Sequence, residues 1–153
     1  MRIALGFGLL VISIVIALFR YDEFSIRNKN NEFFYVFSSK IIENNTREMQ
    51  PFHSVFNETA SSFYSKEVAL KDSEDVFKYV EQNLSNSIDN KQIIDALLSF
   101  TKSGEDKISE SGNELTEITE NAYKKAALEL NKYGKTAFIL YPSAALIAII
   151  ALI

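Results

Sequence analysis

Two long uncharged apolar runs, one near each end of the chain, constrain its fold more than any other feature. The first covers Ile3 to Phe19 and the second covers Thr136 to Ile153. A helix of about 20 mostly apolar residues crosses the roughly 30 Å hydrocarbon core of a bilayer, whereas surface helices of soluble proteins keep one polar face. The sequence therefore predicts an all-α membrane protein. We expect transmembrane helices at residues 1–20 and 136–153, and a helical, amphipathic extramembrane domain at residues 21–135.

The N-terminal run is the stronger of the two candidate spans. It carries twelve Ile, Leu, Val or Phe residues between Arg2 and Arg20, and these contribute roughly −4 to −7 kcal/mol to membrane insertion. A cleaved signal peptide has the same basic start and apolar core, but its cleavage needs small residues. The run ends in the bulky Phe19. We therefore expect an uncleaved signal anchor, with a cleaved signal peptide as the alternative.

The C-terminal run inserts less strongly. Its nine strongly apolar residues and five alanines contribute only about −3 to −5 kcal/mol. As a helix the run is about 27 Å long, slightly less than the hydrocarbon core. Pro142 lacks an N–H and crowds the carbonyl group of Phe138, which predicts a helix kink at this position. A buried core helix is the alternative for a run of this length.

Small residues recur on one face of each run. The spacings of seven, four and three residues place each set on a single helical face, and the two sets are Gly6, Ser13 and Ala17 in the first run and Ala144, Ala148 and Ala151 in the second. Small residues let membrane helices approach closely, which is a main source of affinity between them. We therefore expect these faces to pack on each other or on a partner. We expect Ala144, Ala148 and Ala151 in particular to face protein, although small residues are also common in such helices.

The segment between the runs is acidic. All 20 acidic residues and 15 of the 16 basic residues lie between Arg20 and Lys135, which gives this segment a net charge of −5. Because nucleic-acid binding depends on basic surface, we expect no nucleic-acid partner. Basic residues lie at both flanks of the segment, at Arg20, Arg27, Lys29, Lys124, Lys125, Lys132 and Lys135. The positive-inside rule therefore favours a cytoplasmic domain, with an exported domain as the alternative because long loops can cross regardless of charge.

The middle segment has the apolar periodicity of several helices. Phe33, Phe37 and Ile41 are spaced by four residues, which favours a helix over a strand. Further helices are expected to start at Pro51, Asp72 and Asp89 and to end near Gly104, because proline, capping residues and glycine mark such boundaries. Their apolar faces comprise Phe52, Phe56, Ala60 and Phe63; Val76, Phe77, Val80 and Leu84; and Ile93, Ile94, Leu97 and Leu98.

A longer helix is expected from about Ser111 to Gly134. Ser111 with Glu114 has the pattern of a capping box. The apolar face of this helix is predicted to comprise Leu115, Ile118, Ala122, Ala126, Leu130 and Tyr133. Glu120 and Lys124 are four residues apart, which predicts an ion pair on its surface. If Gly134 does not break this helix, it continues into the C-terminal span.

The sequence contains little that could carry out a reaction. Cysteine is absent and His53 is the only histidine, so thiolate metal sites and His-rich zinc sites are excluded. The spacing of Glu110 and Glu114 places two carboxylates on one helical face, but we interpret this face as a solvated surface. We expect no cofactor, no metal and no enzymatic activity.

Two functional hypotheses follow. The first is a non-enzymatic structural or accessory subunit of a larger membrane assembly, which contacts the lipid bilayer and either other membrane-protein subunits or further copies of itself. The second is a membrane-perturbing effector of the holin or pore-forming type, which oligomerises in the bilayer. The runs themselves contain no ionisable side chain, which argues against a transporter that works alone.

Overall fold

The computed structural model describes residues 2–47, 50–87, 90–103 and 108–152, and in these ranges the regular structure is helical throughout. The elements in chain order are α1 (Arg2–Arg47), α2 (Phe52–Tyr64), α3 (Ser73–Asn83), α4 (Asn90–Lys102), α5 (Ile108–Glu129), the π-helical segment η2 (Leu130–Gly134) and α6 (Lys135–Leu152). The predicted all-α fold is therefore confirmed for the described residues. Two of the helices, one near each terminus, are long and apolar enough to cross a membrane.

The chain forms two compact units. The first, here called the helix pair, comprises Met1–Asn28 and Ala126–Ile153; the second, here called the helical domain, comprises Lys29–Lys125. Helices α1 and α5 each contribute residues to both units. The domain boundaries predicted at residues 20 and 135 stay a prediction.

The helical domain has an aromatic core built around the second half of α1. Phe33, Phe34 and Phe37 are completely buried there, and Phe56 of α2 is buried against them. The ring centroid of Phe56 lies 5.3 Å from that of Phe33 and 5.1 Å from that of Phe37, with the rings nearly perpendicular. Edge-to-face geometry of this kind stabilises aromatic pairs beyond the area that they bury. The segment predicted from the spacing of Phe33, Phe37 and Ile41 is thus helical and lies at the centre of the core.

Two of the predicted helix starts in the domain agree with the structure. Pro51 is the N-cap residue of α2. The carboxylate of Asp72 accepts a hydrogen bond of 2.8 Å from the backbone N–H of Asp75 and so caps α3. A cap of this type satisfies one of the N–H groups that a helix leaves without an internal partner. The predicted boundaries at Asp89 and Gly104 lie outside the described residues.

The segment between α2 and α3 is held by side chains of α2. The Asn57 side chain donates to the backbone carbonyl of Leu70 at 2.8 Å and accepts from its N–H at 3.0 Å. The hydroxyl of Ser61 accepts from the backbone N–H of Val68 at 2.9 Å. These bonds provide backbone partners for a segment that has no regular structure, as buried backbone groups require. Val68 is thereby kept in the core.

Helix α5 begins at Ile108, three residues before the predicted start at Ser111. Ser111 and Gly112 are both buried inside the helix. A Cβ atom added to Gly112 would lie 3.2 Å from Cγ1 of Ile42, so the missing side chain permits close packing against α1 within the domain. Ser111 therefore occupies a buried helical position and does not cap the helix.

Two polar features of α5 belong to the helical domain. The predicted surface pair is confirmed, with Nζ of Lys124 2.6 Å from a carboxylate oxygen of Glu120. The hydrogen bond to Glu120 and its negative charge raise the pKa of Lys124. At a buried position, the hydroxyls of Ser38 and Thr119 lie 2.8 Å apart and share a hydrogen bond, which satisfies polar groups that are removed from water.

Candidate functional site

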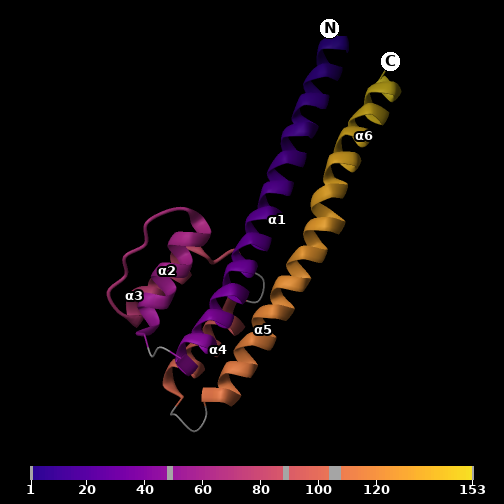
Figure 1. Ribbon diagram of the computed structural model, residues 1–153. Helices are drawn as coiled ribbons and strands as arrows, with labels where there is room; N and C mark the ends of the chain where they lie inside the picture. Colours follow the sequence, from indigo (N-terminus) through magenta and orange to yellow (C-terminus); the bar gives the residue numbers. More distant parts are fainter. Residues whose placement is uncertain (1, 48–49, 88–89, 104–107, 153) are drawn as a thin grey trace. The chain divides into compact units, whose positions relative to one another are not determined.

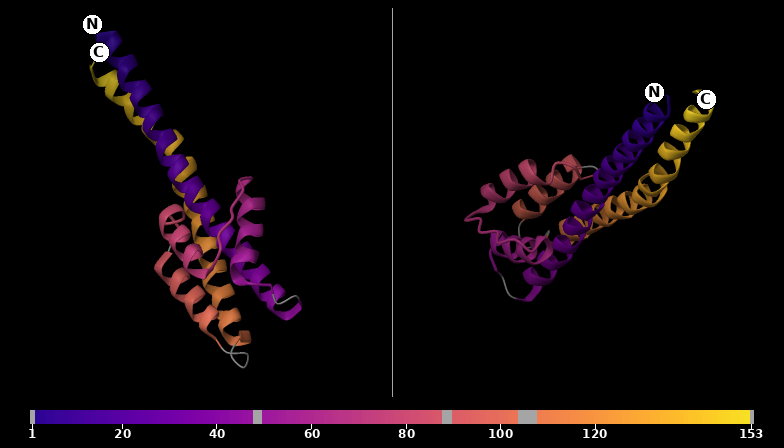
Figure 2. Two further views of the ribbon diagram at one scale, coloured as in Figure 1. Left: turned by 90° about the vertical axis from the view of Figure 1, so that its left-hand side faces the viewer. Right: turned by 90° about the horizontal axis from the view of Figure 1, so that it is seen from above.

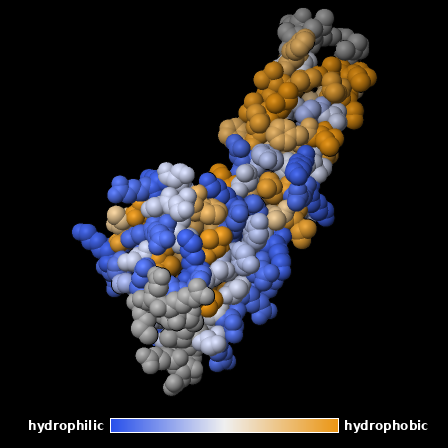
Figure 3. Space-filling view, in the orientation of Figure 1, coloured by the Kyte–Doolittle hydropathy of each residue, from blue (hydrophilic) through white to orange (hydrophobic). Residues whose placement is uncertain are grey.

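The helix pair exposes its apolar side chains. The first half of α1 and α6 lie side by side in every view (Figure 1 and Figure 2). Phe7 is 69% exposed, Phe19 72% and Ile150 74%. Hydrophobic residues gather over both helices of this unit (Figure 3). Soluble proteins rarely expose a continuous apolar surface of this kind, so it indicates contact with a membrane or another protein.

The two helices of the pair approach closely at small residues. A Cβ atom added to Gly6 would lie 3.3 Å from Cγ2 of Ile149, and one added to Gly134 would lie 3.5 Å from Cβ of Phe24. Aromatic contacts join the helices further along, with ring centroids 5.4 Å apart for Tyr21 and Phe138. The pair thus combines close backbone approach with aromatic packing, the first of which is typical of membrane helices.

The two predicted small-residue faces have different environments. Gly6, Ser13 and Ala17 are buried, and the Ser13 hydroxyl donates to the carbonyl of Leu10 within α1. The other three predicted packing residues are exposed, namely Ala144, Ala148 and Ala151. A protein that faces these alanines would therefore have to be a second chain. Their predicted contact with protein stays a prediction.

The π-helical segment η2 explains why the alanine face points outward. A regular α-helix continued from the buried Ala126 would place positions 133, 137, 140, 144, 148 and 151 on the same face. A π-helical turn contains one additional residue. Gly134 is buried where Tyr133 was expected, and further along Ala145 and Ile149 are half-buried where Ala144 and Ala148 were expected, while Ala137 is buried as well. Sequence periodicity alone contains no signal for this extra residue, so the inward face of α6 was missed.

The same shift of register exposes Tyr133. This residue was expected on the apolar face of the long helix, but it is 51% exposed, and its neighbour Gly134 is buried. The ring of Tyr133 stacks on that of Phe24 at a centroid distance of 6.1 Å. Nζ of Lys132 lies 5.1 Å from the centroid of the Tyr133 ring. Gly134 thus does not end the helix, which continues through η2 into α6.

Charged residues follow directly after the apolar part of the pair. A guanidinium nitrogen of Arg20 lies 3.1 Å from a carboxylate oxygen of Glu23, and Arg27 lies 3.8 Å from Glu23 and 3.3 Å from Glu129. The last of these pairs joins α1 to α5 within the helix pair. The pair of Arg20 with Glu23 is exposed, and such pairs contribute at most about 1 kcal/mol each. Their position marks where the apolar surface of the pair gives way to a polar one.

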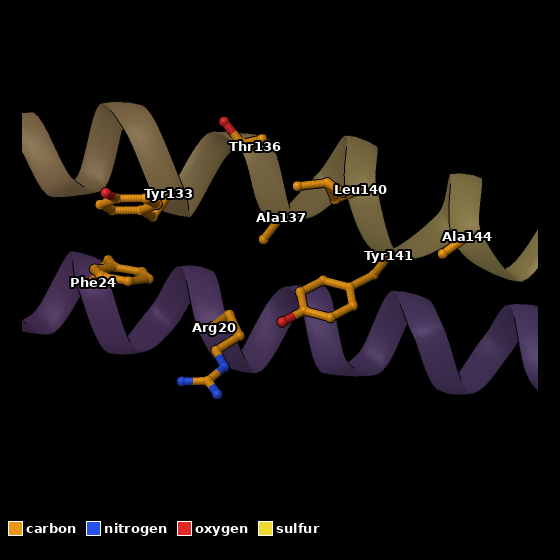
Figure 4. A pocket seen from close by; sticks show the side chains of 8 residues that line it. All are labelled: Arg20, Phe24, Tyr133, Thr136, Ala137, Leu140, Tyr141 and Ala144. Carbon is orange, nitrogen blue, oxygen red and sulfur yellow. The ribbon is translucent and has the colours of Figure 1, made fainter.

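A groove of about 420 Å³ lies at this boundary. Arg20 and Phe24 line it from α1, and the residues that line it from the other helix are Tyr133, Thr136, Ala137, Leu140, Tyr141 and Ala144 (Figure 4). The side chain of Tyr141 extends across the groove, with its hydroxyl end toward Arg20 (Figure 4). The groove is therefore mainly apolar, and the guanidinium group of Arg20, which lines it from α1, is turned away from the facing helix (Figure 4).

The remaining predicted residues give no second site. Pro142 lies inside α6, and its predicted kink stays a prediction. His53 is half-buried in the first turn of α2. Among the described residues, no group of three or more His, Asp or Glu side chains could hold a metal ion.

A scan against protein-family models finds no match, and searches of the curated proteins and of the solved structures find none. The functional argument therefore depends on the geometry of the helix pair and of the helical domain alone.

Proposed function

We propose that this chain is a non-enzymatic accessory subunit of a membrane assembly. In this proposal the helix pair crosses the bilayer, and the helical domain and the exposed Ala148 and Ala151 of α6 bind partner proteins or further copies of the chain. The observation that carries the proposal is the apolar surface of the helix pair, on which Phe7, Phe19 and Ile150 are each more than two-thirds exposed. Burying such surface in lipid contributes about 25 cal/mol per Å².

The arginine and tyrosine residues at the ends of the apolar parts of the helix pair support a transmembrane arrangement. Both helices are long and apolar enough to span, and Arg20, Tyr21 and Tyr133 lie where their apolar parts end. Arginine and tyrosine are favoured at the membrane interface because each has an apolar stem or ring and a polar end. The basic flanks of the middle segment support a cytoplasmic position for the helical domain.

Cysteine labelling tests the membrane topology, because the chain contains no cysteine of its own. Ser39, Ser109 and Ser143 are suitable positions since all three are exposed. A membrane-impermeant maleimide should label Ser39→Cys and Ser109→Cys only after the cells are opened, and should leave Ser143→Cys unlabelled in both conditions. Labelling of Ser39→Cys and Ser109→Cys in intact cells would indicate that the helical domain lies outside the cell. Equal labelling of Ser143→Cys and Ser39→Cys in opened cells would contradict membrane insertion of α6.

Extraction in mild detergent tests the assembly. A subunit should migrate as a species larger than the monomer, whereas a monomer alone would contradict the proposal. Ala148→Phe should reduce that species if the alanine face binds protein, because a large side chain prevents close helix approach. Ile147→Phe is the matched control, since Ile147 is already large and 68% exposed. Dye leakage from cells after induced expression would support a membrane-perturbing effector instead.

A further inference from the structure

The groove of the helix pair has features that suit an amphipathic ligand with a negative charge. Its volume of about 420 Å³ lies within the range of roughly 300–1,000 Å³ found for small-ligand sites. Arg20 provides a permanent positive charge at the polar end. Leu140 and Ala144 provide an apolar surface from that end toward the C-terminal end of α6. Ala144 leaves room there that a larger side chain would fill.

We infer that this groove binds an anionic phospholipid, with the phosphate group beside Arg20 and Tyr141 and one acyl chain along Leu140 and Ala144. The inference rests on the proposed membrane insertion of the helix pair. In a spanning helix, Arg20 lies at the level of the lipid head groups and the residues beyond Leu140 lie among the acyl chains. The groove and the lipid thus have the same order of charged and apolar parts.

Charge complementarity favours lipid over a second protein as the occupant. A guanidinium group forms two parallel hydrogen bonds with phosphate, and the Tyr141 hydroxyl, which extends toward Arg20 (Figure 4), can donate a third. If the domain is cytoplasmic, this end of the pair also meets the leaflet that is rich in anionic lipids. Ala148 and Ala151 are not among the lining residues and are free of this lipid.

Arg20 can exchange its present partner for a phosphate. Its ion pair with Glu23 joins two side chains that are 54% and 48% exposed, and such exposed pairs contribute little. Glu23 also lies 3.8 Å from Arg27. When Arg20 turns to the lipid, the carboxylate of Glu23 therefore retains a cationic partner.

Photo-crosslinking of the full chain in lipid nanodiscs tests this site. The probes are phosphatidylglycerol and phosphatidylcholine with the same diazirine-bearing acyl chain, and mass spectrometry locates the adducts. Adducts on residues 133–144 should be about fivefold more abundant with phosphatidylglycerol, as expected for one basic residue at an anionic surface. Arg20→Gln should abolish the difference, and Arg20→Lys should keep most of it.

Two further variants separate the groove from the rest of the helix. Ala144→Leu fills the groove and should reduce phosphatidylglycerol adducts severalfold, whereas Ser143→Leu, at an exposed position on the same helix outside the groove, should not. Equal labelling by the two lipids would overturn the lipid site. Cross-links between two chains at groove residues, with few lipid adducts, would overturn it in favour of protein.

Carbonate extraction distinguishes failure of the lipid site from failure of the proposed function. A chain that resists extraction and shows no preference for phosphatidylglycerol keeps its membrane anchor and loses only the specific site. A chain that carbonate releases from the membrane overturns both.

Discussion

The helical domain and the helix pair use the same types of apolar side chain in opposite ways. Among the described residues, every member of the hydrophobic core cluster lies between residues 29 and 125, and every large hydrophobic residue that is exposed lies in the helix pair. Phe33 is completely buried, whereas Phe7, on the same helix, is 69% exposed. Since α1 is one continuous helix, the difference reflects two different solvents along it: protein interior for one half and, in our proposal, lipid for the other.

The largest expected difference between the two units comes from truncating a phenylalanine in each. Phe33→Ala should lower the free energy of unfolding by about 3–5 kcal/mol, because it leaves a cavity in a packed core. Phe7→Ala should change it by well under half of that. Chemical denaturation of the full chain in mild detergent, followed by circular dichroism, measures both. Similar losses for the two variants would contradict the contrast between the units.

Placing a charge on the exposed apolar surface tests which solvent it meets. Ile12 lies near the middle of the N-terminal run and is 57% exposed. Ile12→Lys should disfavour membrane insertion by about 3–4 kcal/mol and shift the chain into the carbonate-soluble fraction, while Ile12→Leu should not. Unchanged membrane retention of Ile12→Lys would show that this face meets water or a polar partner.

A buried polar contact in the helical domain gives a pH-dependent test. The Tyr64 hydroxyl donates to Oδ1 of Asn30 at 3.1 Å, and burial, with a smaller contribution from Tyr79, raises the pKa of Tyr64 above its ordinary value of 10.0. Tyr64→Phe leaves a buried acceptor without this donor, so it should lower the free energy of unfolding by about 1–3 kcal/mol near pH 8.

The difference between wild type and Tyr64→Phe should shrink as the pH rises above 10. Tyrosine in the unfolded chain then ionises while folded Tyr64 keeps its proton, so the unfolded state is favoured. Denaturant unfolding across this pH range measures the effect, and Tyr123→Phe controls for the loss of a half-buried tyrosine hydroxyl elsewhere in the domain. A difference that is constant with pH would contradict the assignment.

The smallest expected effect concerns the hydrogen bond between Ser38 and Thr119. Thr119 is 1% exposed, and Thr119→Val should lower the free energy of unfolding by about 1 kcal/mol. Thr119 also contacts the backbone carbonyl of Thr116, three residues before it, at 3.1 Å. Thr101 donates to the carbonyl of Leu98 at the same spacing but is exposed. Thr101→Val should therefore have an effect close to zero. Equal values for the two would indicate that this polar contact does not stabilise the domain.

Features that depend on local chemistry were predictable from the sequence. The helix around Phe33, the cap at Asp72 and the pair of Glu120 with Lys124 follow from spacing or from capping, and the structure contains all three. The start of α5 was harder to predict, because Ser111 and Glu114 have the sequence pattern of a capping box although the helix begins at Ile108. Ser111 and Glu114 lie inside the helix instead. The neighbouring Gly112 packs closely against Ile42, a contact that depends on the tertiary fold.

The groove and the inward face of α6 could not be predicted. Both depend on where the two helices of the pair meet and on the single additional residue in η2. Arg20 was recognised only as a flanking charge, and Tyr141 was not singled out. Their juxtaposition at one groove joins residues that are more than a hundred positions apart in the sequence.

The η2 segment has a consequence for how this chain can vary in sequence. One helical residue corresponds to a rotation of about 100°, so a further residue inserted between Leu130 and Gly134 would turn the whole of α6 about its axis. Loss of one residue there would convert the π-helical turn into an α-helical one and keep the same face of α6 inward. The insertion would place Ala144, Ala148 and Ala151 on the inward face in place of Ala145 and Ile149, and the groove would lose its lining. Related chains should therefore tolerate the loss of one residue in this segment better than the gain of one.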